Sequence, residues 1–416
     1  MTEPLVSIVV AMYNVETYIS ECLDSILMQD YDNIEIICID DASTDKTISI
    51  IESYKEKDER IYIIKLSKNS GPSTVRNAGI DSAKGKYILF VDGDDLISQN
   101  LVSRTVSCAE RNNLDEVSFG YRIFSEGEEW KWKVKNMLRK DVAFDSLLTG
   151  RDMLVMKNKM LKYANGKLAS SATGAWLYKK DFLISNNLRY TDGISVGEDK
   201  LFWFQCCLYA KRVMMISQEL YLYRKHNGSL TTGWQCTRAK SILAMISIIY
   251  AEWVKNRFSN EENEAIASLL NGEWSSYRKA VLRGETEDID INPAINFCYN
   301  FFHGNRLYKY GKLTANTVDE LKAVENIFVY GSGYAAADVF DQLETLHIKP
   351  LGVMVTQMEG NTPSFGGVPV KTLEDWGMVN NATVIIAVTG KYSNGIESML
   401  RQKGYKRIIK VKETEC

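Results

Sequence analysis

The chain is organised around Tyr87-Ile88-Leu89-Phe90-Val91-Asp92-Gly93-Asp94-Asp95. Its five apolar residues in succession predict a strand that is buried on both faces. Three carboxylates then fall within four positions, which is unfavourable at the end of a buried strand unless a cation binds there. Oxygen ligands suit a hard divalent ion such as Mg2+ or Mn2+, and Gly93 lets the backbone turn so that Asp92 and Asp94 converge. An acidic surface turn is the alternative, and neighbouring motifs must decide between the two.

The composition of the chain excludes several classes of protein. Its 416 residues are too many for one core and predict two or three domains. A net charge of -3 gives no sign of nucleic-acid binding. The longest apolar patch, Ile242 to Trp253, is about half as long as a membrane span, so we expect no transmembrane helix. The eight cysteines form no C-x-x-C pair and the N-terminus has no secretory leader, so we expect reduced thiols and a cytoplasmic protein.

Strands alternate with helices before the opening stretch. We expect strands at 6–10, 34–39 and 61–66, each followed by a helix. This alternation predicts a parallel sheet, in which ligands gather beyond the carboxyl ends of the strands. Several polar residues come just past such ends, namely Tyr13, Asp41, Arg76 and the D-G-D-D run.

Four motifs share this edge of the expected sheet. They are A-M-Y-N at 11–14, C-I-D-D-A-S-T-D at 38–45, G-P-S-T-V-R-N-A-G at 71–79 and F-V-D-G-D-D at 90–95. In order and spacing they resemble the donor-binding half of a family 2 glycosyltransferase with the GT-A fold. The resemblance covers roughly the first 235 residues.

The resemblance implies a role for each motif residue. Tyr13 would stack on the nucleotide base, and Asp41 would accept a hydrogen bond from the base edge. Asp92 would hold the ribose, Asp94 the metal ion, and Arg76 would lie near the donor sugar and its phosphates. The nucleotide-sugar site would also include Ala11, Asn14 and Gly93. A core tyrosine and a helix-capping aspartate are the structural alternatives for Tyr13 and Asp41.

The region after residue 112 is expected to form the acceptor side. Trp130-Lys131-Trp132-Lys133 alternates as an edge strand does, and either tryptophan could stack on a sugar or simply pack. The segment 175–182 resembles the part of the same family that packs beneath the acceptor cleft, which makes Trp176 a predicted acceptor contact.

The step Glu198-Asp199 is expected to open a helix. Acids at a helix N-terminus are explained by capping and the helix dipole alone. Transfer to a hydroxyl, however, needs a base within hydrogen-bond reach of its proton. The resemblance implies that Asp199 is this base and that Glu198 binds the acceptor.

The strand at 220–224 is followed by a basic loop that resembles the family's segment over the diphosphate. Arg224 and Lys225 would offset the charge of the leaving group, with Ser229 in the same nucleotide-sugar site. His226 would ligate the metal or bond a phosphate. Processive relatives carry Q-x-x-R-W near here, whereas this chain has Q-C-T-R-A at 235–239, which implies addition of a single sugar.

The pattern changes after residue 235. Two amphipathic helices are predicted, with apolar stripes at 242–253 and 266–281, and another helix is expected at 293–302. A strand at 326–330 then leads into Gly331-Ser332-Gly333-Tyr334-Ala335-Ala336, a G-x-G-x-x-A turn, with further strands at 351–355, 383–388 and 407–411. Dinucleotide binding would require an acid where Thr356-Gln357 stands, so a scaffold for assembly or acceptor placement is favoured.

The predicted fold class is therefore α/β with three parts. Residues 1–235 are expected to form a GT-A, Rossmann-like nucleotide-sugar-binding domain, divided into a donor half at 1–112 and an acceptor half at 113–235. A helical connector would cover 236–320. A small C-terminal Rossmann-like βαβ domain would cover 321–416.

The expected activity follows from the resemblance. It implies an inverting, metal-dependent transferase that uses Mn2+ or Mg2+ and moves one hexose from a UDP-sugar, with UDP-galactose or UDP-glucose favoured. The acceptor would be a glycan hydroxyl in surface polysaccharide or glycoprotein glycan synthesis, with peripheral membrane contact left open. A nucleotidyltransferase is a weaker alternative because no glycine-rich loop follows the first strand. A catalytically silent UDP-sugar sensor or assembly subunit is the other alternative.

Overall fold

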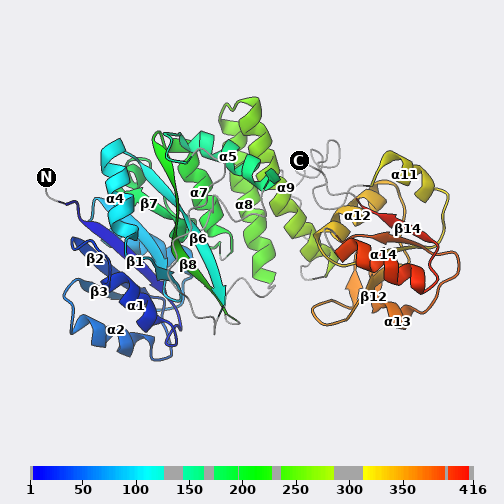
Figure 1. Cartoon of the computed structure of the whole chain (residues 1–416), viewed down its shortest axis with the longest axis horizontal. Coiled ribbons are helices and arrows are strands. Elements are labelled where there is room, and N and C mark those ends of the chain that lie inside the picture. Colours follow the sequence, from blue (N-terminus) through cyan, green and yellow to red (C-terminus); the bar gives the residue numbers. More distant parts are fainter. Residues whose placement is uncertain are drawn as a thin grey trace. The chain divides into compact units, whose positions relative to one another are not determined.

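The computed structural model describes residues 3–125, 144–163, 173–194, 196–226, 236–284, 313–388 and 392–411. The chain forms two compact units (Figure 1). The first unit contains residues 1–233 and 257–266, and the second contains 234–256 and 267–416. The predictions for Trp130, Trp132, Ser229 and a helix at 293–302 fall outside the described residues.

The first unit is built on one mixed sheet. The order of its strands is β3-β2-β1-β4-β7-β6-β8-β5. Its strands are β1 (Val6–Met12), β2 (Ile34–Asp40), β3 (Ile61–Lys65), β4 (Tyr87–Asp92), β5 (Leu96–Ile97), β6 (Glu116–Ser125), β7 (Trp176–Lys179) and β8 (Val213–Lys225). Its helices are α1 (Ile19–Leu27), α2 (Thr47–Lys55), α3 (Pro72–Ser82), α4 (Leu101–Asn112), α5 (Gly150–Tyr163), the 3-10 turn η1 (Thr173–Ala175), α6 (Lys180–Ser185) and α7 (Glu198–Tyr209).

The parallel half of this sheet matches the sequence prediction. β1 pairs in parallel with both β2 and β4, and β2 pairs in parallel with β3. Antiparallel pairing begins where β7 lies between β4 and β6. The predicted α/β class is confirmed, but the short strands β5 and β7 were not predicted, because two to four residues carry too little periodicity to be recognised.

The central strand β1 is buried on both faces. Val6, Ile8 and Val10 share a core with apolar residues of α1 and α4. Val9 points to the opposite face, since successive strand residues alternate, and there it meets α3 at Gly79. A Cβ at Gly79 would lie 2.3 Å from a methyl group of Val9. The last glycine of the G-P-S-T-V-R-N-A-G motif therefore lets α3 pack closely on the sheet.

The second unit carries its own sheet, in the order β11-β12-β10-β9-β13-β14. All pairs are parallel except β11 with β12. The strands are β9 (Ile327–Tyr330), β10 (Gly352–Val355), β11 (Ser364–Phe365), β12 (Val368–Thr372), β13 (Thr383–Ile386) and β14 (Arg407–Lys410). The helices of this region are α8 (Cys236–Lys255), α9 (Asn260–Leu282), α11 (Ala315–Leu321), α12 (Tyr334–Thr345), α13 (Leu373–Trp376) and α14 (Tyr392–Gln402).

The strand order of the second unit is Rossmann-like, with the switch of direction between β9 and β13. The predicted turn at Gly331 follows β9, where the glycine adopts φ 108°. A Cβ there would lie 2.9 Å from Val388 and 3.0 Å from the Ala387 carbonyl oxygen, so only glycine fits. Thr356, at the position where a ribose-binding acid was sought, bonds its hydroxyl to Tyr330 at 3.0 Å.

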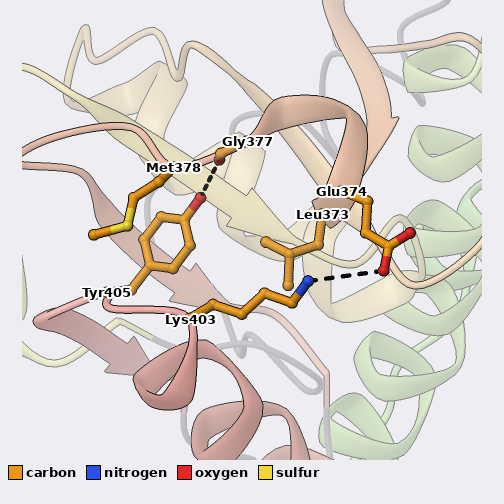
Figure 2. A pocket seen from close by; sticks show the side chains of 6 residues that line it. All are labelled: Leu373, Glu374, Gly377, Met378, Lys403 and Tyr405. Atoms are coloured by element: carbon orange, nitrogen blue, oxygen red, sulfur yellow. Dashed lines mark hydrogen bonds and ion pairs between the residues drawn. The ribbon is translucent and has the colours of Figure 1, made fainter.

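A small pocket of about 370 Å³ lies elsewhere in the second unit (Figure 2). Its lining residues are Leu373, Glu374, Gly377, Met378, Lys403 and Tyr405. Gly377 and Tyr405 precede β13 and β14, so the pocket lies toward the amino ends of these strands, away from the turn at Gly331. Tyr405 donates to the Gly377 carbonyl oxygen at 2.9 Å, and Lys403 lies 3.8 Å from Glu374.

The two amphipathic helices are confirmed. Their apolar stripes are buried at Ile242, Ile246 and Ile249 in α8 and at Ile266, Leu270, Trp274 and Tyr277 in α9. Arg278 of α9 pairs with the buried Asp341 of α12 at 2.6 Å, which fixes the end of α9 within the second unit. Among the described residues, no helix combines the length and apolar character needed to cross a bilayer.

A buried acid at the start of β6 makes the stability of the first unit depend on pH. Burial raises the pKa of Glu116 from its ordinary 4.5 to about 8. Between these pH values the folded protein keeps a proton that the unfolded chain has lost, so stability falls as the pH rises. We expect Glu116→Gln to raise the unfolding temperature more at pH 8 than at pH 5, measured by calorimetry. The exposed Glu56→Gln is the control, and an equal shift at both pH values would contradict the prediction.

Candidate active site

The register of β1, β2 and β4 brings three motifs together. Ala11 lies opposite Asp92, and Met12 lies opposite Asp40. The Gly93 amide donates to the Ala11 carbonyl oxygen at 2.9 Å, and a Cβ at Gly93 would lie 3.0 Å from Met12. Ala11 and Gly93 therefore contribute backbone at a position where two loops approach closely.

In the A-M-Y-N motif, the ring of Tyr13 is exposed and Asn14 makes structural hydrogen bonds. Tyr13 is 46% exposed at the end of β1, so one face of the ring is accessible to a ligand. Asn14 adopts φ 52° and links two loops, because its amide donates to Ser43 and its side-chain oxygen accepts from the Thr44 amide. Asn14 thus supports the loop that presents Tyr13.

Asp41 is buried, and both of its carboxylate oxygens are bonded. They accept from the amides of Ser70 at 2.7 Å and Gly71 at 2.8 Å, just before α3 begins at Pro72. These bonds hold the loop before α3 and do not cap the helix, whose N-cap Gly71 has no side-chain cap bond. Each carboxylate oxygen can accept more than one hydrogen bond, so a contact to a base edge is still open to Asp41.

Arg76 joins the two acidic regions of the site. Its guanidinium, only 7% exposed, donates to Asp92 at 2.9 Å and to Glu198 at 2.8 Å. Burial disfavours the charged guanidinium, but Asp92 and Glu198 outweigh this effect and the pKa of Arg76 is raised. Both terminal nitrogens of the guanidinium contact carboxylates. Arg76 is therefore already paired, and it would act on a bound ligand by orienting Asp92.

The predicted metal ligands Asp94 and His226 meet although 132 positions separate them. A carboxylate oxygen of Asp94 lies 2.9 Å from Nε2 of His226. Burial, and then the charge of Asp92, raise the pKa of Asp94. The ring of Tyr18 packs against His226 with a centroid separation of 4.6 Å, so an aromatic face orients the imidazole.

Within the described part of the chain, His, Cys, Asp and Glu side chains nowhere gather in groups of three suited to a metal ion. Asp94 and His226 offer two ligands. Mg2+ is commonly bound by one or two carboxylates while substrate phosphates and water fill the other positions. Two protein ligands therefore fit a divalent ion whose other positions are filled by a substrate and water.

Arg224 lies in a cage of aromatic and acidic groups. Its guanidinium lies 4.9 Å from the ring of Tyr18 and 4.7 Å from that of Phe124. It donates to the Asp94 carbonyl oxygen and to Glu21, each at 2.7 Å. Arg224 is therefore a fixed positive charge beside the backbone of Asp94, whereas the neighbouring Lys225 is exposed.

Tyr221 was missed by the sequence analysis. Its hydroxyl donates to the buried Asp95 at 2.6 Å. The oxygen of this hydroxyl also accepts a hydrogen bond from the Asp92 amide at 3.2 Å. The Arg224 amide supplies a second hydrogen bond to Asp95. A tyrosine within an apolar strand indicates packing, so no pattern in the sequence marked this residue as the anchor of the D-G-D-D turn.

Glu198 and Asp199 open α7, as predicted. Burial, and then the charge of Asp199, raise the pKa of Glu198 to about 7. Burial also raises the pKa of Asp199, although Arg76, Lys200 and Lys157 oppose it. A carboxylate with a raised pKa is a candidate general base.

Trp176 is fully buried in β7, and its ring lies 6.4 Å from that of Tyr178 with an angle of 26° between the planes. An indole with no exposed surface cannot touch an acceptor in this conformation. It belongs to the core of the first unit.

Part of the chain is similar to known proteins. The model of the glycosyl transferase family 2 matches residues 7–185. EpsJ, an uncharacterized glycosyltransferase of Bacillus subtilis, is 37% identical over 228 residues, which are 55% of this chain and 63% of EpsJ. The glycosyltransferase GlyG of Streptococcus pneumoniae is 30% identical over 252 residues, which are 58% of this chain and 78% of GlyG. The match to EpsJ thus covers less than two thirds of that relative.

A solved structure shares the fold. The crystal structure of Staphylococcus aureus TarS, residues 1–349, in complex with UDP-GlcNAc aligns with a TM-score of 0.55 at 20% identity. The alignment covers 82% of this chain and 92% of that one. TarS is described as a poly(ribitol-phosphate) beta-N-acetylglucosaminyltransferase and is 27% identical over 220 residues, 52% of this chain and 35% of TarS.

The Arg76 bridge gives a prediction about stability. Arg76→Met leaves two partly buried carboxylates without their cation, which costs about 3 kcal/mol when a buried pair is broken. Adding Glu198→Gln removes one of these charges, so the double variant should recover part of the loss. Urea unfolding midpoints of the single and double variants measure this. Additive losses would show that Arg76 and Glu198 do not act on each other.

Proposed function

The chain belongs to the glycosyl transferase family 2, and on that premise we propose that it moves one hexose from a UDP-sugar to a glycan hydroxyl with inversion. The observation that carries the proposal is the Arg76 bridge. One guanidinium binds both Asp92, in the D-G-D-D turn, and Glu198, which directly precedes the proposed base Asp199. A donor-binding turn and a base are thus held together by one side chain, as direct displacement requires.

The proposed donor site follows the edge of the parallel strands. The exposed ring of Tyr13 would stack on uracil, and Asp41 would accept from the base edge. Asp92, with its side chain 38% exposed, would hold the ribose while Arg76 fixes its orientation. Backbone of Ala11 and Gly93 would complete the contacts, and Asn14 would support them.

Asp94 and His226 are the proposed ligands of Mn2+ or Mg2+. When bound, such an ion offsets the charge that develops on the departing diphosphate. The caged guanidinium of Arg224 adds a fixed positive charge beside Asp94. Lys225, and Ser229 beyond the described residues, would contact the diphosphate from the same loop.

Asp199 is the proposed general base. It would take the proton of the acceptor hydroxyl as that oxygen attacks the anomeric carbon from the face opposite UDP. Attack from this face inverts the configuration. Glu198 would lie beside the acceptor, held by Arg76.

The candidate donors and acceptors can be ranked for testing. UDP-glucose and UDP-galactose are our favoured donors, and the UDP-GlcNAc bound to TarS makes UDP-GlcNAc the next one to test. The proposed acceptors are surface polysaccharide or glycoprotein glycans. Free thiols at all five cysteines whose side chains are described support a reducing, cytoplasmic setting.

The first experiment measures UDP release. We expect the purified protein with Mn2+ and simple sugar acceptors to release UDP from one UDP-hexose, and EDTA to abolish the release. Asp199→Asn should lower kcat on the order of a hundred-fold to ten-thousand-fold with unchanged affinity for UDP, because the base acts in the transition state. Asp94→Ala should weaken metal and UDP binding together. Binding without release under every acceptor would favour the sensor alternative.

The raised pKa values predict the pH profile. The carboxyls of Glu198 and Asp199 titrate as a pair with raised pKa values, and the base works only after losing its proton. Activity should therefore fall as the pH drops through this raised range, well above the ordinary aspartate value of about 4. Glu198→Gln removes a like charge and should move the acidic limb to lower pH. Profiles of kcat/KM for both proteins test this, and an unmoved limb would refute the coupling.

A further inference from the structure

One face of α3 bonds to the segment that leads to α7. Ser73 donates to the Ile194 carbonyl oxygen at 3.3 Å, and Thr74 donates to Asp192 at 3.2 Å. Arg76 adds the contact to Glu198 described above. The polar residues of the S-T-V-R-N run therefore contact a region more than a hundred positions away, at spacings of 118 to 122 residues for these three contacts.

Asn77 makes the most specific of these contacts. Its side-chain nitrogen donates to the Tyr190 carbonyl oxygen at 2.8 Å, and its side-chain oxygen accepts from the Tyr190 amide at 2.9 Å. One amide thus satisfies both backbone groups of a single residue, as a neighbouring strand would. This reciprocal pair fixes the position and the orientation of Tyr190.

The ring of Tyr190 carries this constraint to α7. It stacks on Phe202 with a centroid separation of 4.0 Å and an angle of 13° between the planes. Phe202 lies three positions after Asp199, on the same side of the helix. The same ring meets Phe90 of β4 edge-on and lies 5.4 Å from the guanidinium of Arg76. Tyr190 is therefore wedged between the central sheet and the helix that carries the proposed base.

We propose that Asn77 is a positioning residue for the transfer reaction, because its two hydrogen bonds to Tyr190 set the place of α7 and so of Asp199. This inference rests on the proposed function of Asp199. In the structure Asn77 bonds to neither Asp92 nor Asp94, so it acts on the base and not on the donor. Its loss should therefore lower turnover without weakening UDP binding.

The test compares Asn77→Ala with Asn33→Ala. Asn33 also loses a side-chain hydrogen bond, from its nitrogen to the Glu3 carbonyl oxygen at 2.7 Å, but at the amino end of β2. We expect Asn77→Ala to lower kcat about ten-fold to a hundred-fold, because a small misplacement of a catalytic group has costs of that order. The affinity for UDP, measured by calorimetry, should stay within about two-fold of the parent. Asn33→Ala should match the parent in both.

A second measurement does not depend on activity. Amide hydrogen exchange should speed up in Asn77→Ala over peptides covering 188–205, with peptides covering 19–27 unchanged. Asn77→Asp keeps the acceptor for the Tyr190 amide and loses the donor, so its exchange and its kcat should fall between those of the parent and Asn77→Ala. This variant also serves if Asn77→Ala fails to fold.

The outcomes separate the two proposals. Unchanged exchange over 188–205, or unchanged kcat, would overturn the role of Asn77 and leave the transferase proposal intact. A parent protein that never releases UDP would overturn the proposed function, while the exchange result would still decide whether Asn77 positions α7. Loss of UDP affinity equal to the loss of kcat would assign Asn77 to the donor site instead.

Discussion

The buried guanidinium of Arg76 is the interaction on which the rest of the site depends. A cation that is 93% removed from solvent is stable only if its charge is matched within the protein, and Asp92 and Glu198 match it from opposite sides. Glu198 depends on the cation most, because burial disfavours its charged form, whereas the side chain of Asp92 is 38% exposed. This mutual dependence fixes the distance between the D-G-D-D turn and the first residue of α7. The site is therefore one electrostatic unit rather than two neighbouring ones.

The backbone features of this unit could be predicted from the sequence, because each depends on a local pattern. The apolar run at 87–91 marked the buried strand β4, and the alternation of strands and helices marked the parallel sheet. Residues at the carboxyl ends of parallel strands must share an edge, so Tyr13, Asp41 and Asp92 were expected together. The meeting of Asp94 and His226, 132 positions apart, came from the resemblance to a family and not from any local pattern.

The side-chain partners could not be predicted, because they come from distant parts of the chain. Asp41 stays the proposed acceptor for a base edge, but its bonds to the amides of Ser70 and Gly71 were not predicted. Trp176 was assigned to an acceptor, yet the antiparallel insertion of β7 buries it completely. Arg224 was recognised as a functional cation, but its cage formed by Tyr18, Phe124 and Glu21 joins three elements whose contacts no spacing reveals. Partners of this kind are fixed by topology, and a sequence pattern extends over only a few turns of helix or residues of strand.

Burial of the carboxylates lowers folding stability, but it also makes them stronger bases. Burial raises the pKa values of Asp94, Asp95, Glu198 and Asp199, so each charged carboxylate here is held at the expense of folding stability. A fully solvated aspartate would be a weak base at neutral pH, whereas a carboxylate raised toward neutrality accepts a proton more readily. The positive charge of Arg76 opposes this rise, because it lowers the pKa values of both Glu198 and Asp199. A protein that placed these carboxylates in water would avoid this cost in stability and would lose the proposed base.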